Sequence, residues 1–193
     1  GLTSILGDVA IWGSLTILTI SISKIIFNAG SLGYGIMDGF YGAGALLSTL
    51  VSGYFIKRLK KQNYLLICFI FAGIMCVLAP MFPTLILASV AYLIMGLCNN
   101  SARIATRTVF MEMVSNKIMG RVQTIFGMYT RVMVIASSLT AGYLVEKFSV
   151  LSGMTFSAGH FLVSAMGVII IMESLEFRKV LLPQKPMSNR NQI

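Results

Sequence analysis

The chain has 193 residues, of which 56% are hydrophobic and only 11% are charged, and its mean hydropathy is +0.86. A soluble domain is about 25% charged, and so few charged residues would not cover the surface of a soluble protein. These values exclude a soluble enzyme, a disordered region and a disulfide-rich secreted domain, and they predict a membrane protein. The excess of 15 Lys and Arg over 6 Asp and Glu is better explained by membrane topology than by nucleic-acid binding.

Six stretches contain the roughly 20 predominantly apolar residues that a helix needs to cross a bilayer. In chain order they are residues 2–23, 34–56, 64–82, 84–102, 122–145 and 150–172. Pro80 and Pro83 separate the third span from the fourth and favour a tight turn over one continuous helix.

Most basic residues follow the second, fourth and sixth spans, which places them on one side of the membrane. They are Lys57, Arg58, Lys60, Lys61, Arg103, Arg107, Lys117, Arg121, Arg178, Lys179, Lys185 and Arg190. The opposite loops hold only Lys24 and Lys147. The positive-inside rule makes the basic side cytoplasmic. We therefore expect a multi-pass protein of a cell membrane, such as a bacterial inner membrane, with both ends of this chain in the cytoplasm.

The chain begins with Gly1, and the first span has neither the basic n-region nor the short apolar core of a signal peptide. We expect it to start partway through a longer protein. Residues 1–175 are predicted to form a six-helix bundle and residues 176–193 a basic cytoplasmic tail. Cys68, Cys76 and Cys98 lie in apolar runs without metal-ligand spacing, so we expect no metal and no cofactor.

Spans two and five contain similar segments. Residues 48–58 (STLVSGYFIKR) align with residues 137–147 (SSLTAGYLVEK), 89 positions later. Span two runs toward the cytoplasm and span five away from it, so the match relates three-helix units of opposite topology. Many secondary transporters contain such an inverted repeat inside each half. We expect an all-α membrane protein of six transmembrane helices built as a 3+3 inverted repeat.

Charged residues inside the spans are candidates for a solute or proton pathway, because a charge in the membrane is costly and usually faces a cavity or a partner. Asp8 lies in span one, and Asp38 lies about 6 Å into span two. Arg131 lies about 15 Å beyond Arg121, near mid-membrane. Asp38 and Arg131 each belong to a stripe of small and polar residues: Asp38, Gly42, Ala45, Thr49 and Ser52 in span two, and Gln123, Gly127, Arg131, Ser138 and Gly142 in span five.

Two interpretations of these stripes remain open. In the first, the small residues allow close helix packing, and Asp38 and Arg131 form an ion pair. In the second, Arg131 contacts the solute or couples its transport, and Asp38 or Asp8 carries a proton. Asn99 and Asn100, late in span four, either bind solute or join helices. His160 in span six is expected to be packed and hydrogen-bonded rather than to relay protons.

Six spans with a histidine in the last are also found in intramembrane serine proteases of the rhomboid type. Those enzymes need a Gly-x-Ser-Gly nucleophile in the fourth span, which residues 84–102 do not contain. The sequence also has no phosphate-binding loop. We expect the protein not to be an enzyme.

Six spans, cytoplasmic ends and an inverted repeat resemble the C-terminal half of a major facilitator superfamily transporter, over about residues 1–175. The loop GYFIKRLKK at residues 53–61 is similar to the family's Gly-x-x-x-Asp-Arg-x-Gly-Arg-Arg gating loop. Gly53 and Arg58 match, and Lys61 matches by charge. The family's acidic residue is replaced by Lys57 and its second glycine by Lys60.

The segment at residues 107–122, which ends in Gly120, Arg121 and Val122, resembles that of drug, macrolide and siderophore exporters in this superfamily. The resemblance implies that spans one, two, four and five line a central cavity and that spans three and six face lipid. It implies alternating access by rocking of two halves. The implied partners are the lipid bilayer, the missing N-terminal six-helix half, a small-molecule substrate and protons, with no nucleic acid.

The sequence thus predicts half of a secondary active transporter that exports a small amphipathic solute in exchange for protons. The alternative is a six-span subunit or scaffold that packs against partner proteins without transporting. Its polar stripes would then be helix interfaces.

Overall fold

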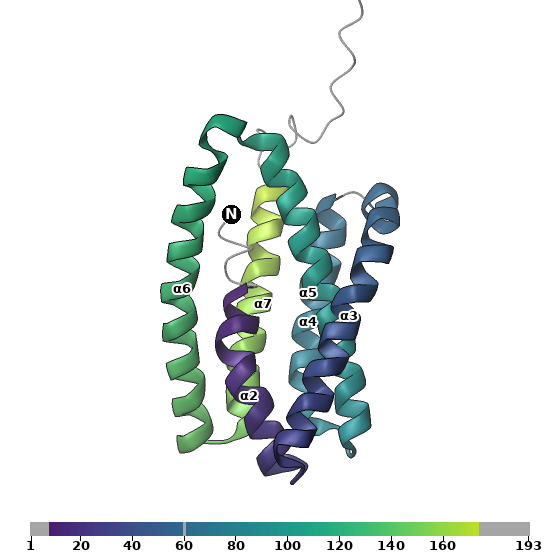
Figure 1. The fold of residues 1–193 in the computed structure, drawn as a ribbon, viewed down its shortest axis with the longest axis vertical. Coiled ribbons are helices and arrows are strands. Elements are labelled where there is room, and N and C mark those ends of the chain that lie inside the picture. The colour runs from purple at the N-terminus through teal and green to yellow at the C-terminus, as the bar shows by residue number, and fades with distance from the viewer. Residues whose placement is uncertain (1–7, 60, 174–193) are drawn as a thin grey trace, which may run out of the picture.

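The computed structural model describes residues 8–59 and 61–173, and these residues form helices and short turns without strands (Figure 1). The elements are η1 (Ala10–Leu15), α2 (Thr16–Ser21), η2 (Ile22–Ile26), α3 (Gly30–Leu59), α4 (Lys61–Leu78), η3 (Ala79–Met81), α5 (Leu85–Met113), α6 (Asn116–Lys147) and α7 (Val150–Glu173). Here η1 and η2 are π-helical and η3 is a 3₁₀-helix.

Five of these helices are long and apolar enough to cross a membrane, and they correspond to predicted spans two to six. The apolar windows lie in Gly30–Leu59, Lys61–Met81, Leu85–Thr108, Ile118–Lys147 and Val150–Ile170. The first predicted span is represented by the shorter apolar segment Ala10–Ile26, which we call the first segment together with Asp8 and Val9. Residues 2–7 of that span and the predicted tail at 176–193 lie outside the described residues.

Several helices extend past the predicted spans. The fourth span was expected to end at residue 102, but α5 continues to Met113, and α6 begins at Asn116 rather than at residue 122. Hydropathy marks where apolar residues stop, whereas a helix ends where its backbone hydrogen bonds end. Arg103 and Arg107, which the sequence placed in a loop, are therefore helical.

The first segment is not a regular α-helix. Two π-helical stretches flank the short α2, and π turns occur frequently at functional sites. The segment ends in a turn where Asn28 and Gly30 have φ values of 50° and 54°. The Ser23 hydroxyl donates a hydrogen bond to the Gly30 carbonyl at 2.5 Å, which holds the turn against α3.

Helices α3 and α5 pack so closely that their backbones are in contact. A Cβ atom at Gly44 would overlap the carbonyl oxygen of Leu93, and one at Gly96 would overlap the carbonyl oxygen of Tyr41. Gly44 lies four residues before the buried Ser48, and this pair of small residues lets the two backbones meet. Gly35 and Gly39, which are also four residues apart, both have open space around them.

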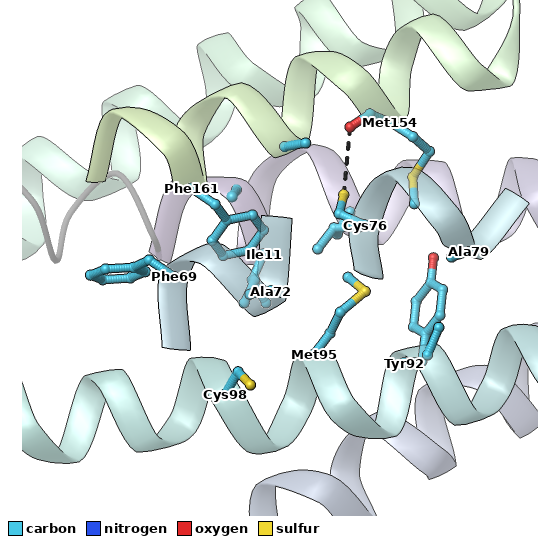
Figure 2. Packing of buried hydrophobic residues seen from close by; sticks show 14 of the residues in the cluster. Ile11, Phe69, Ala72, Cys76, Ala79, Tyr92, Met95, Cys98, Met154 and Phe161 are labelled. Atoms are coloured by element: carbon cyan, nitrogen blue, oxygen red, sulfur yellow. Dashed lines mark hydrogen bonds between the residues drawn. The ribbon is translucent and has the colours of Figure 1, made fainter. Parts of the chain in front are cut away.

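The core joins α4, α5 and α7. Phe69, Ala72 and Cys76 of α4 are buried, and Figure 2 shows Cys76 between Met95 of α5 and Met154 of α7. The Cys76 thiol lies 3.5 Å from the Met154 carbonyl oxygen and donates a hydrogen bond to it. This core sets the positions of α5 and α7, and thereby the positions of the two sides of the bundle.

Helices α3 and α6 lie at the edges of the bundle, whereas the first segment contributes buried residues to the core. The first segment packs against α6 and α7, whereas α3 packs against α5. Figure 1 shows α6 beside the first segment and α7, and α3 beside α4 and α5. Only 17% and 11% of the apolar windows of α3 and α6 are buried, against 44% or more for the other three long helices. Two long apolar faces are thus left uncovered.

Candidate solute pathway

A cavity of about 1110 Å³ lies between the first segment, α5 and α6. Its polar lining residues are Asp8, Arg103, Thr106, Arg107, Gln123, Thr130 and Arg131. Its remaining lining residues are Trp12, Met111, Phe126, Gly127, Val134 and Ile135. Charged groups and an apolar wall therefore line the same cavity. In small-molecule sites the polar groups orient the ligand and the apolar wall buries it.

Arg131 lies at the middle of α6, which runs from Asn116 to Lys147. Arg131 also lines the cavity. No hydrogen bond or ion pair joins Arg131 to another residue within the described ranges. A charged residue within a membrane-spanning helix is costly unless it faces water or a partner, and the cavity provides such surroundings for Arg131.

Asp8 of the first segment pairs with Arg103 of α5 across the cavity. The distance from Asp8 Oδ1 to Arg103 Nε is 3.2 Å, and the side chains are 24% and 30% exposed, respectively. Arg107, one helical turn further along α5, is close enough to act electrostatically on the same carboxylate. The carboxylate thus lies near two arginines that were not among the site residues predicted from the sequence. Their four-residue spacing, which places both on one helix face, was the available signal.

Asp38 is not part of this cavity. It lies on α3, is exposed and forms no ion pair with Arg131. The predicted Asp38–Arg131 pair is therefore not formed. The physical reason is that α3 packs against α5, whereas α6 packs against the first segment and α7.

Asn99 and Asn100 join α5 to α3. Asn99 Nδ2 donates a hydrogen bond to the Tyr41 hydroxyl at 3.0 Å. Asn100 Nδ2 donates to the Ala45 carbonyl at 3.0 Å and to the Ser48 hydroxyl at 2.6 Å. These contacts correspond to the helix-joining interpretation, and neither asparagine lines the cavity described above.

A second polar contact continues this α3–α5 interface. Ser52 donates a hydrogen bond to Ser101 at 2.9 Å, and the Tyr64 hydroxyl of α4 donates to Ser52 at 3.3 Å. In α7, His160 Nδ1 lies 3.1 Å from the Phe156 carbonyl oxygen, and the two rings meet edge to face. This is the packed environment expected for His160.

The residues of the two gating-loop motifs lie at one end of the bundle. Arg58 donates a hydrogen bond to the Tyr54 hydroxyl at 2.8 Å, while Gly53 is exposed. Lys61 begins α4, and Gly120 and Arg121 are exposed in the first turns of α6. Figure 1 shows that the end of α3 and the start of α6 lie at the same end, so the basic segments at these positions lie on one side, as the topology predicts.

The family model of the Major Facilitator Superfamily matches residues 2–190 of the chain. No curated protein and no solved structure matches it significantly. The family match spans nearly the whole chain and agrees with its long apolar helices. It describes a family of membrane transporters rather than enzymes, which implies a bilayer around the helices and a small-molecule substrate. The chain belongs to the major facilitator superfamily.

Proposed function

We propose that the chain is the C-terminal six-helix half of a secondary active transporter that exports a small amphipathic solute in exchange for protons. The observation that carries this proposal is the cavity, which Arg131 at the centre of α6 lines together with the Asp8–Arg103 ion pair. A scaffold would need no such cavity, and the family does not favour the scaffold alternative. The exporter direction rests on the resemblance of residues 107–122 to exporter segments.

The packing of the helices supports the proposed 3+3 inverted repeat. In that repeat the first segment, α3 and α4 correspond to α5, α6 and α7. The contact between α3 and α5 then corresponds to the contact between α6 and the first segment, and both are present. The uncovered faces of α3 and α6 are the surfaces that the N-terminal six-helix half would cover, which completes the pathway.

Among the candidate carboxylates, Asp8 is better placed than Asp38 to carry the proton. Asp8 lines the cavity. Its ionised carboxylate pairs with Arg103, whereas a protonated carboxyl would lose this ion pair. Protonation of Asp8 would remove the attraction between the first segment and α5. The two π-helical stretches in the first segment offer places where it can bend in response. Arg131 holds the solute or balances the charge at the centre of the pathway.

The cavity extends toward the end of the bundle that carries the basic segments. Gln123 lies about 12 Å from Arg131 along α6, and both residues line the cavity. With the basic end in the cytoplasm, the cavity lies in the cytoplasmic half of the membrane. The residues of the two gating-loop motifs lie at that end, where the closing of the two halves of the transporter would be controlled. They are Gly53, Arg58, Lys61, Gly120 and Arg121.

Proton flux driven by a panel of model solutes tests this function. The native-length protein is reconstituted into liposomes that contain the pH dye pyranine. A panel of anionic, neutral and cationic naphthalene amphipaths is then added. We expect at least one solute to drive a proton flux that a protonophore abolishes, and Arg131→Gln to remove that flux.

Lys147→Gln, at the end of the same helix and outside the cavity lining, serves as the control and should keep the flux. Wild-type flux in the Arg131→Gln protein would exclude the proposed role of Arg131. Absence of proton flux with every solute, in protein that is correctly inserted, would exclude proton-coupled transport of this kind of solute.

A further inference from the structure

The cavity has an excess of positive charge. Among the described residues that line it, the ionisable ones are Asp8, Arg103, Arg107 and Arg131. One carboxylate therefore faces three guanidinium groups, and arginine stays charged at any pH that a protein experiences. Asp8 pairs with Arg103, which leaves about two positive charges to be balanced by something else.

Two of these arginines have no directly bonded partner in the described part of the chain, although Arg107 acts electrostatically on Asp8. Neither Arg107 nor Arg131 forms a hydrogen bond or an ion pair with another residue of the described ranges. Arg107 belongs to α5 and Arg131 to α6, so the two guanidinium groups come from different walls of the cavity. A guanidinium presents its donors as a planar fork that matches carboxylate, sulfonate and phosphate oxygens. Their arrangement is suited to an anionic group bound between the two helices.

The other walls suit an apolar body attached to that anion. Trp12 of the first segment lines the cavity, and so do Met111 of α5 and Val134 and Ile135 of α6. An indole ring gives a flat apolar surface that also attracts aromatic ligands. An inorganic anion would leave these apolar walls uncovered, whereas an amphipathic organic anion would contact both the arginines and the apolar residues.

We infer that the cavity binds an amphipathic organic anion, with the acidic group of the ligand between Arg107 and Arg131 and its apolar body against Trp12. The Asp8–Arg103 pair stays intact in this arrangement, so the proposed proton site is not consumed by binding. The inference rests on the proposed transport function for its biological meaning, but binding is measurable without transport. The ligand is either a solute from the aqueous phase or an anionic lipid, and both share this chemistry.

Trp12 provides the measurement, because it is the only tryptophan in the chain and it lines the cavity. The 193-residue chain is placed in phosphatidylcholine nanodiscs, and energy transfer from Trp12 to two naphthalene probes is titrated. The probes are 8-anilinonaphthalene-1-sulfonate and N-phenyl-1-naphthylamine, which share the aromatic body and differ by the sulfonate. Trp12→Phe gives the background. We expect the sulfonate probe to bind at least about tenfold more tightly, the scale of a charged hydrogen bond.

Variants show whether the arginines cause this preference. Arg107→Gln and Arg131→Gln should each reduce sulfonate binding about tenfold and leave binding of the neutral probe unchanged, which also shows that the variant is folded. Arg131→Lys should retain part of the preference, and Lys147→Gln all of it. Equal binding of the two probes by the wild type, or equal losses in Lys147→Gln and Arg131→Gln, would overturn the inference.

Anionic lipid distinguishes the two sources. When phosphatidylglycerol replaces half of the phosphatidylcholine, a lipid ligand would compete with the sulfonate probe in the wild type but not in Arg131→Gln. If the ligand is instead a solute from the aqueous phase, phosphatidylglycerol would reduce binding of the sulfonate probe equally in the wild type and in Arg131→Gln. Both results support an anion site and assign its ligand. Proton flux that persists without any anion preference would overturn this inference alone, whereas an anion preference without proton flux would overturn only the proposed function.

Discussion

Asp8 and Arg103 form an ion pair of 3.2 Å that joins the first segment to α5 across the cavity. The pair therefore connects the charge state of the cavity to the position of the first segment. Mutation of the two residues distinguishes an ion pair that only stabilises the fold from one that also responds to protonation.

Removal of one member of this pair should be worse than removal of both. Asp8→Asn leaves Arg103 without its carboxylate, and Arg103→Gln leaves Asp8 charged and unpaired in the membrane, which is costly. We expect each single variant to lower the melting temperature in detergent, and the double variant to recover part of the loss. Strictly additive losses would show that the pair makes no coupled contribution.

The same ion pair should govern proton coupling. Asp8→Asn mimics the protonated carboxyl permanently, so proton-driven flux should be lost while exchange of solute against solute across the liposome membrane persists. Asp38→Asn should keep coupled flux, because Asp38 lies outside the cavity. The reverse pattern, in which coupling is lost only in Asp38→Asn, would assign the proton site to Asp38 on α3.

The close approach of α3 and α5 predicts which glycines cannot be replaced. Gly44→Ala and Gly96→Ala place a Cβ against a backbone carbonyl oxygen that cannot move aside. Each should destabilise the bundle by roughly 2 kcal/mol or more, measured as loss of folded protein on heating in detergent. Gly39→Ala, where the space around the Cβ is open, is the matched control. A neutral Gly44→Ala would mean that the two helices do not meet at Gly44.

Asn100 should matter for stability rather than for solute binding. Asn100→Leu removes the hydrogen bonds to Ala45 and Ser48, which should cost about 1 kcal/mol. Coupled flux per folded protein should stay at the wild-type level. A variant of normal stability that has lost solute-dependent flux would assign Asn100 to solute binding instead.

The sequence predicted the approximate positions of the five long apolar helices that the structure describes, because the bilayer imposes a length and a polarity on every crossing helix. It also placed Arg131 near the middle of the fifth span, and the residue lies at the middle of α6. It did not predict that Asp38 and Arg131 stand apart, because which helices are neighbours depends on packing among all of them.

Helix ends and helix distortions were also missed. Arg103 and Arg107 looked like loop residues because hydropathy falls there, although α5 continues through them. The π-helical stretches of the first segment have no signature in apolar periodicity. Arg103 and Arg107 joined the cavity residues only in the structure, because α5 continues past its apolar part.

The most direct test of the account is whether one face of α6 lines an aqueous cavity that is open to the cytoplasm. Cys68, Cys76 and Cys98 are first replaced by Ala or Ser. Single cysteines are then introduced by Thr130→Cys and Val134→Cys in the cavity lining and by Leu139→Cys at an exposed apolar position outside that lining. They are treated in inside-out vesicles with the membrane-impermeant sulfonatoethyl methanethiosulfonate. The account predicts rapid labelling at positions 130 and 134, slow labelling at 139, and slower labelling at 130 when Arg131 is changed to Gln. Labelling of position 139 as fast as the other two, or no labelling at 130 and 134, would contradict it.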